Sequence, residues 1–233
     1  MPQSRAVGRP PARHQRSGDP AEKSDNADSS TRQRLLDAAV ACIAEEGYYR
    51  ASSNHIARRA GVTWGVIQHY FGTREQLLLE VARVGAADLL STFENATIVG
   101  TTARERLESL AEVMWSYYCR PEFLVGVQVV MNLSRDPATA IETVKALDEL
   151  AQRTTAGWQH LVDQVVPADR QPPGFRSGLH CILRGAAVGE ALLDAMVARP
   201  SPAVRPDHDR ERELLFTALA HLLPPDTGPE LEA

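Results

Sequence analysis

The sequence predicts an all-α protein in two parts, a small three-helix head at residues 31–83 and a larger helical bundle at residues 84–223. Three observations predict this fold. Apolar residues recur at helical spacing, and no segment alternates with the period of two that is typical of a strand. Gly61 and Gly72 separate short helical segments in the head and favour turns there. A chain of 233 residues also leaves room for a second domain after such a head.

Residues 51–71 form the most informative segment, with the sequence ASSNHIARRAGVTWGVIQHYF. Its first helix carries an apolar face at helical spacing, formed by Ile56, Ala57 and Ala60. Ser52 is the expected N-cap, because its hydroxyl accepts a hydrogen bond from a free amide of the first turn. Gly61 is expected to adopt the positive φ at which the chain turns, and Thr63 to cap the next helix. The segment therefore predicts a helix-turn-helix.

The second helix of this motif has an unusual outer face. Val66 and Ile67 are expected to pack inward together with Tyr70 or Phe71. The outer face is then formed by Trp64, Gly65, Gln68 and His69. Aromatic and amide groups with few charges suit the acceptors, donors and thymine methyl groups of the DNA major groove. We therefore expect a DNA-recognition helix. Contacts to bases are expected from Trp64, Gly65 and Gln68, contacts to the DNA backbone from Ser53, Thr63, His69 and Arg74, and contacts of either kind from Asn54 and Tyr70.

Gly72 ends the recognition helix, and a new helix is expected to begin directly after it. Thr73 and Gln76 have the spacing of a capping box, in which each side chain bonds to the backbone of the other residue. Arg74 lies in the first turn, where the helix dipole disfavours a cation. Two interpretations of Arg74 stay open: it contacts a DNA phosphate, or it is a solvated surface residue.

Residues 31–83 resemble the TetR (tetracycline-repressor-like) family of transcriptional regulators. The parts of that pattern occur in order: the helix TRQRLLDAAVACIAEEG, the pair Gly47-Tyr48, the segment IARRAGVT, a recognition helix ending in an aromatic pair, and the Thr-Arg-Glu start of the next helix. His55, Ser53 and Gln68 depart from the residues that are frequent in the family, and these departures bear on the operator sequence. The resemblance implies a dimer with a helical body that generally binds small, often hydrophobic or cationic molecules.

The charge distribution fits a DNA-binding head. Residues 1–83 carry 12 Lys and Arg against 9 Asp and Glu, whereas residues 84–233 carry 13 against 21. The head is therefore mildly basic and the body acidic. Residues 1–30 are expected to be a disordered arm, because they contain almost no large apolar side chains. Their early arginines leave two roles open, a solvated tail or an arm that enters the minor groove.

The body is expected to contain helices throughout. An apolar stripe runs from Leu107 to Tyr118, and the run from Phe123 to Leu133 is apolar nearly all round, which favours a buried central helix. A long helix is expected over Ile141–Val165, and two more over Phe175–Val197 and His208–Leu223. A proline-rich stretch at 200–206 joins the last two helices, and residues 224–233 are expected to fray.

The two final helices are the expected dimer interface. Their apolar stripes comprise Leu179, Ile182, Leu183, Ala186 and Leu193 in the first helix, and Leu215, Leu219 and Leu222 in the second. Pairing with symmetry mates would form a four-helix bundle with an isologous two-fold contact. The alternative is that both stripes are buried within one subunit. A two-fold dimer requires an approximately palindromic operator.

The body is also expected to bind an effector. Gln128 and Asn132 lie four residues apart on an otherwise apolar helix, and buried amides need hydrogen-bond partners that a ligand can supply. The expected walls of a largely apolar pocket are Met114, Trp115, Tyr117, Tyr118, Phe123, Met131, Trp158 and His180. The alternative is that these residues form core and that the amides bond to neighbouring helices.

The sequence lacks the minimal motifs of common enzymes, such as HExxH, GxxxxGK and GxSxG, and we expect neither catalysis nor a cofactor nor a metal site. Cys42, Cys119 and Cys181 are far apart and odd in number, which favours reduced thiols in the cytoplasm. No signal peptide or membrane span is expected. The predicted function is a dimeric regulator that binds a palindromic double-stranded DNA operator and responds to a small, largely apolar effector as a repressor. Two alternatives stay open: a regulator without small-molecule sensing, and an activator.

Overall fold

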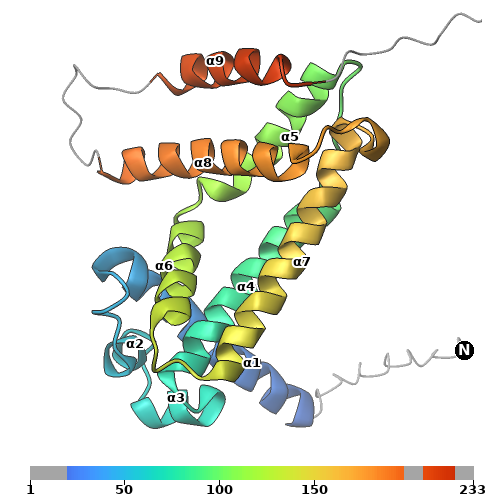
Figure 1. The fold of residues 1–233 in the computed structure, drawn as a ribbon. Helices are drawn as coiled ribbons and strands as arrows, with labels where there is room; N and C mark the ends of the chain where they lie inside the picture. Colours follow the sequence, from blue (N-terminus) through green and yellow to red (C-terminus); the bar gives the residue numbers. More distant parts are fainter. Residues whose placement is uncertain (1–19, 197–206, 224–233) are drawn as a thin grey trace, which may run out of the picture.

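The computed structural model describes residues 20–196 and 207–223, and the regular elements within these ranges are all helical (Figure 1). The prediction of an all-α protein is confirmed. In chain order the elements are α1 (Pro20–Glu46), α2 (Ser53–Arg59), α3 (Trp64–Phe71), α4 (Arg74–Asn95), α5 (Ala103–Tyr118), α6 (Pro121–Arg135), α7 (Ile141–Val165), a short 3-10 helix (Ala168–Arg170), α8 (Phe175–Met196) and α9 (His208–Ala220).

Helix α1 is longer than the sequence analysis expected. It begins at Pro20, so residues 20–30 are helical and do not belong to a disordered arm. The expectation of disorder rested on the lack of large apolar residues in this stretch. A helix that has already formed can be extended without the cost of nucleation, so these residues can be helical with few apolar contacts. The remainder of the expected arm, the proline-rich stretch at 200–206 and the expected frayed tail at 224–233 lie outside the described residues.

The head consists of α1, α2, α3 and the first turns of α4, packed around one core. Its largest fully buried side chains are Leu35, Ile43, Ile56, Ile67, Leu77 and Leu78. Val125, Val129 and Leu133 of α6 and Leu147 of α7 join the same cluster. Helix α4 also runs without a break through the expected domain boundary after residue 83. The head is therefore connected to the body by a continuous helix and by shared apolar packing.

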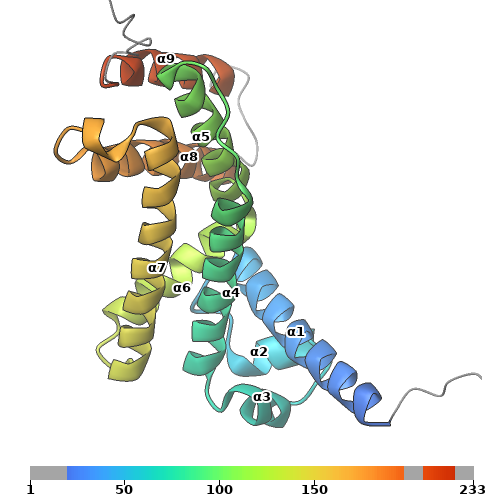
Figure 2. The same cartoon turned by 90° about the vertical axis from the view of Figure 1, so that its right-hand side faces the viewer.

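The body extends away from the head along α4 and α7, which pack side by side (Figure 2). Gly157 of α7 permits this close approach, because a Cβ atom there would lie 3.1 Å from Cδ2 of Phe93 and 3.2 Å from Cδ2 of Leu90. At the end far from the head, α8 and α9 cross α5 (Figure 1). A second core lies there, and its largest fully buried side chains are Leu107, Leu110, Met114, Trp158, Leu161 and Leu183.

Helix α6 is not the buried central helix that its apolar sequence predicted. Only Val125, Val129 and Leu133 of this helix are buried, whereas Val130 and Met131 are 39% and 45% exposed. One face packs against the core of the head, and much of the remaining apolar surface borders a cavity. A helix between a core and a cavity needs apolar residues on both sides, so composition alone did not distinguish it from a buried helix.

Candidate DNA-recognition surface and effector cavity

The turn of the helix-turn-helix has the predicted local structure. The hydroxyl of Ser52 accepts a hydrogen bond from the amide of His55 at 3.3 Å and caps α2. Gly61 has a φ of +70°, which is the left-handed conformation expected at this position. The amide of Val62 donates to the carbonyl of Ala57 at 3.0 Å, and Ile67 anchors α3 with 1% exposure. These contacts hold α3 at a fixed angle to α2.

The outer face of α3 is directed away from the core. Trp64 is 45% exposed, and Gly65, Gln68 and His69 are also exposed. Thr63 stands at the N-cap of α3, but its side chain makes no capping hydrogen bond, so the hydroxyl remains available to a ligand. An exposed tryptophan beside an exposed amide gives this short helix an apolar and hydrogen-bonding surface of the kind that reads base edges.

The other predicted contact residues differ in their surroundings. Asn54 is exposed on α2 and Ser53 is half-buried beside it. The hydroxyl of Tyr70 donates a hydrogen bond to the carboxylate of Asp28 in α1, and this bond raises the pKa of Tyr70. Tyr70 thus connects the recognition helix to α1, which is an internal role that the sequence analysis did not assign.

Arg74 is bound to the backbone of its own head. Its Nε donates to the carbonyl oxygen of Ala51 at 3.0 Å, and a terminal nitrogen donates to the carbonyl oxygen of Tyr48 at 2.7 Å. Its guanidinium carbon lies 4.6 Å from the centre of the Tyr48 ring. These carbonyl oxygens and this ring, rather than a DNA phosphate, explain why a cation lies at the start of a helix. Arg74 thereby connects α4 to the segment that precedes α2.

Only half of the predicted capping box is present at the start of α4. The hydroxyl of Thr73 accepts from the amide of Gln76 at 3.1 Å, but the side chain of Gln76 donates to Thr143 of α7 at 3.4 Å. The Thr143 hydroxyl in turn donates to the carboxylate of Glu75. Thr143 is fully buried and is the one buried polar side chain in the part of the chain whose side chains are described. The beginning of α7 is therefore bonded to the beginning of α4, directly after the recognition helix.

Two exposed residues beside the motif were missed by the sequence analysis. Tyr49 is 86% exposed, and Arg50 next to it is exposed and forms no ion pair with any described residue. Both lie in the turn between α1 and α2. An exposed aromatic residue and an exposed arginine in a turn next to a helix-turn-helix are candidates for contact with DNA.

A cavity of about 740 Å³ lies between α1, α4, α6 and α7 and reaches the ends of α5 and α8. Of the residues predicted to form a pocket, Tyr117, Tyr118, Phe123, Met131 and His180 line it. Gln128 and Asn132, which led to the prediction, do not line it, and Asn132 donates to the Gln128 carbonyl of its own helix at 2.7 Å. Their role as ligand-binding amides is therefore corrected.

Met114 and Trp115 are also not cavity residues. Met114 is fully buried in the second core, and the indole nitrogen of Trp115 donates to the carboxylate of Glu190 at 2.6 Å. Helical spacing identified these residues as inward-facing, but the inside of a helical body contains both core and cavity. Only the packing of all its helices separates the two.

A second, more open cavity of about 810 Å³ lies along α8 and the end of α7. It is lined by Trp158, which was predicted for the pocket, and it shares Val127, His180 and Arg184 with the first cavity. The two cavities therefore meet at these three side chains.

His180 lies at this junction in a desolvated environment. Its ring stacks on Trp158 with a centroid distance of 4.7 Å, and its Nε2 lies 3.4 Å from the hydroxyl of Tyr118. Burial, and then the nearby charge of Arg184, lower the pKa of His180 to about 4, while burial raises the pKa of Tyr118 to about 12. Both side chains are thus neutral near pH 7.

The neutral state of His180 predicts a pH dependence of stability. Because the folded-state pKa lies below the unfolded value, the unfolded chain binds more protons between these values and stability falls with falling pH. When the pH falls from about 7.5 to about 5, we expect His180→Gln to lose less free energy of unfolding than the parent protein does. The difference between the two losses is up to ~2 kcal/mol. Urea unfolding at both pH values measures it, with His160→Gln on α7 as the control. An equal loss in His180→Gln and the parent would contradict the assignment.

The apolar residues of α8 and α9 divide into two groups. Leu179, Leu183 and Leu219 are buried within the protomer, and Ala186 and Leu215 are half-buried, so these positions pack mainly on the protein's own core. Ile182, Leu193 and Leu222 are 37%, 48% and 57% exposed. Leu192 and Leu214 are also exposed. Leu179, Leu183 and Leu219 therefore belong to the core of the protomer, and a dimer interface formed by the exposed members of the predicted set stays a prediction.

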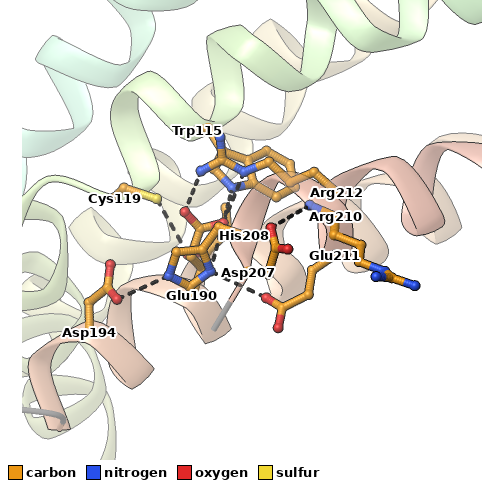
Figure 3. A network of polar contacts seen from close by, with 10 residues as sticks. Trp115, Cys119, Glu190, Asp194, Asp207, His208, Arg210, Glu211 and Arg212 are labelled. Carbon is orange, nitrogen blue, oxygen red and sulfur yellow. Dashed lines mark hydrogen bonds and ion pairs between the residues drawn. The ribbon is translucent and has the colours of Figure 1, made fainter. Parts of the chain in front are cut away.

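A polar network connects α9 to the body (Figure 3). Glu190 of α8 accepts from Trp115 of α5 and from Arg212 of α9. His208 of α9 lies 3.1 Å from the carboxylate of Asp194, and this contact raises the pKa of His208. The network fixes α9 across α8 and α5, so the exposed leucines of both helices are presented on a rigid surface.

Cys42 is buried, Cys119 and Cys181 are exposed, and all three are free thiols. Within the described ranges, no cluster of His, Cys, Asp and Glu is suited to a metal ion. The helices that the structure describes include none that is long and apolar enough to span a bilayer.

Comparison with known proteins identifies the head. Residues 35–81 match the family described as bacterial regulatory proteins, tetR family. The chain is 38% identical over 82 residues to the HTH-type transcriptional regulator BetI of Agrobacterium fabrum, covering 35% of this chain and 40% of BetI. It is 30% identical over 124 residues to the HTH-type transcriptional repressor AcnR of Corynebacterium glutamicum, covering 52% of this chain and 62% of AcnR. The matches thus span between two fifths and three fifths of these relatives.

Solved structures extend the likeness of fold to the body. A bacterial regulatory protein of the tetR family from Rhodococcus RHA1 superposes with a TM-score of 0.62 at 16% identity, covering 84% of this chain and 98% of that one. FadR of Bacillus subtilis, solved in complex with stearoyl-CoA, superposes with a TM-score of 0.60 at 18% identity, covering 82% of this chain and 98% of FadR. Residues 35–81 therefore match the helix-turn-helix of the tetR family of bacterial regulatory proteins, and the described chain shares the overall fold of these solved structures.

Proposed function

We propose that this protein is a dimeric, sequence-specific DNA-binding transcriptional regulator, a repressor whose binding to a palindromic operator is controlled by a small molecule. The observation that carries the proposal is the outer face of α3, where Trp64, Gln68 and His69 are exposed on a helix that is anchored by Ile67. The relatives named as transcriptional regulators, and AcnR as a repressor, support it. We propose that it acts in the cytoplasm and has no catalytic role.

Each part of the recognition surface has a proposed task. The amide of Gln68 pairs with adenine in the major groove, and Trp64 packs on thymine methyl groups or on sugar. Thr63, His69 and Arg50 contact phosphates and set the register of the helix on the duplex. Ser53, Asn54 and Gly65 are further contact residues of the predicted set. Tyr70 and Arg74 of that set are instead bonded within the head.

The cavities favour a regulator that senses a ligand over one controlled only by abundance. A volume of about 740 Å³ is within the range of small-molecule sites, and apolar side chains from α4, α6 and α7 dominate its walls. A regulator without sensing would be expected to fill this space with side chains. The FadR structure, which was solved in complex with stearoyl-CoA, shows a small molecule bound to a neighbour in fold.

The contacts at Thr143 provide a route from the cavity to the recognition helix. Leu147 and Leu150 of α7 line the cavity about one and two turns after Thr143, which bonds to Glu75 and Gln76 of α4. A ligand that shifts α7 therefore moves the start of α4, which directly follows α3. The change in DNA affinity is limited by the difference in ligand affinity between the two arrangements.

Selection of bound sequences from random duplex DNA tests the proposed function. We expect an approximately palindromic operator with half-sites about one helical turn apart. Gln68→Ala is expected to relax the preference at one position in each half-site, at a cost of about 1–3 kcal/mol. Gln152→Ala, an exposed glutamine on α7 outside both cavities, is the matched control and should return the parental operator. A parent protein that enriches no sequence would refute the proposal.

A further inference from the structure

The arginines that border the two cavities differ in their partners. Arg120 pairs with Asp88 at 2.9 Å, and Arg176 pairs with Asp163 at 2.6 Å. Arg184 forms no ion pair or hydrogen bond with any residue that the structure describes. Arg184 is thus an exposed cation at the wall of both cavities, without an acidic partner among the described residues.

Arg184 lies at the point where the cavities meet. Together with Val127 and His180 it lines both of them. Its guanidinium carbon lies 6.0 Å from the centre of the Tyr118 ring and 5.9 Å from that of Phe123. These aromatic faces attract a cation, but they do not neutralise its charge or satisfy its five N–H donors.

The remaining surroundings of Arg184 offer donors but no compensating negative charge. His180 and Tyr118 are both neutral near pH 7, and each can donate or accept a hydrogen bond. Beyond this junction, the first cavity is walled mainly by apolar side chains, such as Val81, Leu89, Leu147 and Leu150. A polar, positively charged point thus lies at one end of an apolar space.

The acidic residues that line the first cavity do not pair with Arg184. Asp88 is paired with Arg120, and Asp37 accepts a hydrogen bond from Gln33 at 2.8 Å. Glu122 lies in the first turn of α6, where the helix dipole stabilises its negative charge. None of them forms an ion pair with Arg184. These carboxylates therefore do not compete for its guanidinium group.

We propose that the effector of this regulator is an amphipathic organic anion, whose carboxylate or similar group binds Arg184 at the junction and whose apolar part fills the first cavity. This inference rests on the proposed function and names the class of its ligand. Arginine presents a planar pair of donors that matches a carboxylate. The tail contacts α7 at Leu147 and Leu150, the segment that continues to Thr143.

Calorimetric titration with three ligands of equal chain length tests the ligand class. Decanoate, decan-1-ol and decylamine, each below its micellar concentration, differ only in the head group. We expect decanoate to bind the full-length protein at least about tenfold more tightly than decan-1-ol, since each tenfold corresponds to about 1.4 kcal/mol and an ionic hydrogen bond contributes at least that much. Tighter binding of decylamine than of decanoate, or no binding of decanoate, would overturn the proposal.

Variants at position 184 test whether Arg184 binds the carboxylate. Arg184→Gln is expected to lose the preference for decanoate while it still binds decan-1-ol, which shows that the cavity remains folded. Arg184→Lys keeps the charge but not the planar pair of donors, and it should retain part of the preference. Arg153→Gln on α7 removes an exposed arginine that borders neither cavity, and it should bind decanoate like the parent. Unchanged decanoate affinity in Arg184→Gln would refute the assignment.

The DNA-binding experiment separates this inference from the function on which it rests. If the parent selects an operator but decanoate neither binds nor releases it, the ligand class is wrong and the proposed regulator stands. If the parent selects no operator, the proposed function fails whatever the titration shows. Release of the selected operator by decanoate in the parent, and not in Arg184→Gln, is the expected result.

Discussion

Replacement of Arg74 by alanine is expected to weaken binding to every DNA duplex while leaving the salt dependence of binding unchanged. Arg74 donates to the carbonyl oxygens of Ala51 and Tyr48 and lies over the Tyr48 ring. Its loss leaves two acceptors without their charged donor and frees the start of α4 from the segment before α2. The recognition helix between these two segments then loses its fixed orientation.

The expected size of the effect follows from these contacts. Hydrogen bonds from a charged group contribute about 1.5–3 kcal/mol each, and Arg74 is half-buried, so a loss of about 2–4 kcal/mol in the free energy of unfolding is expected. A residue that contacts a phosphate behaves differently. Its removal reduces the slope of log affinity against log salt by about one and leaves the stability of the protein almost unchanged.

Two measurements distinguish these roles. Thermal unfolding of Arg74→Ala should show a lower midpoint, and titration of a fixed duplex at several salt concentrations should give the parental slope. Arg74→Lys should not restore stability, because one ammonium group does not span both carbonyl oxygens. Arg50→Ala is the matched comparison, because Arg50 is exposed without an ion pair among the described residues. A reduced slope with unchanged stability in Arg74→Ala would show a phosphate contact instead.

The local features of the head were predictable from the sequence because they depend on neighbouring residues. Ser52 caps α2, Gly61 has a positive φ and Ile67 is buried, all as local rules predict. Arg74 shows the limit of these rules. Its partners lie 23 and 26 residues earlier in the chain, and nothing in the helix itself indicates them. The helix-dipole rule correctly marked Arg74 as an unusual cation at the start of a helix. It did not identify the carbonyl oxygens of Ala51 and Tyr48 that bind the guanidinium group.

The lining of the proposed effector cavity was less predictable for the same physical reason. An apolar residue at helical spacing points inward whether a neighbouring side chain or an empty space faces it. Met114 and Phe123 were therefore predicted together, although Met114 is fully buried in the core and Phe123 lines the cavity. Arg184 was not predicted at all. Its importance comes from the lack of an acidic neighbour, which is visible only when the surrounding helices are in place.

The double substitution Ile182→Glu and Leu193→Glu is expected to convert the protein into a folded monomer with strongly reduced operator affinity. The two side chains are 37% and 48% exposed on α8, and Leu222 of α9 is 57% exposed. A Cβ atom added at Gly185 or Gly189 between them would meet nothing within 4 Å, so this stretch of α8 leaves room for the close approach of a second helix. Two carboxylates on such a surface would face their own copies across a two-fold axis.

Loss of the dimer acts on DNA binding through geometry. Two linked heads bind successive half-sites with an effective concentration that separate monomers lack, so we expect operator affinity to fall by about 100-fold or more. Each head would keep its own contacts, and the sequence preference for one half-site should remain. Sedimentation equilibrium measures the mass in solution, and titration of the full operator and of a single half-site measures both consequences.

Two control proteins make the result specific to this surface. Val99→Glu with Ile141→Glu adds the same charges at positions that are 62% and 59% exposed elsewhere, and it should remain dimeric. Leu183→Ala truncates a fully buried neighbour of Ile182, so it should lower the free energy of unfolding by about 2–5 kcal/mol without changing the association state. If the α8 double variant instead sediments as a dimer with parental operator affinity, the two-fold contact lies on another face. The exposed leucines of α8 and α9 would then need a different explanation.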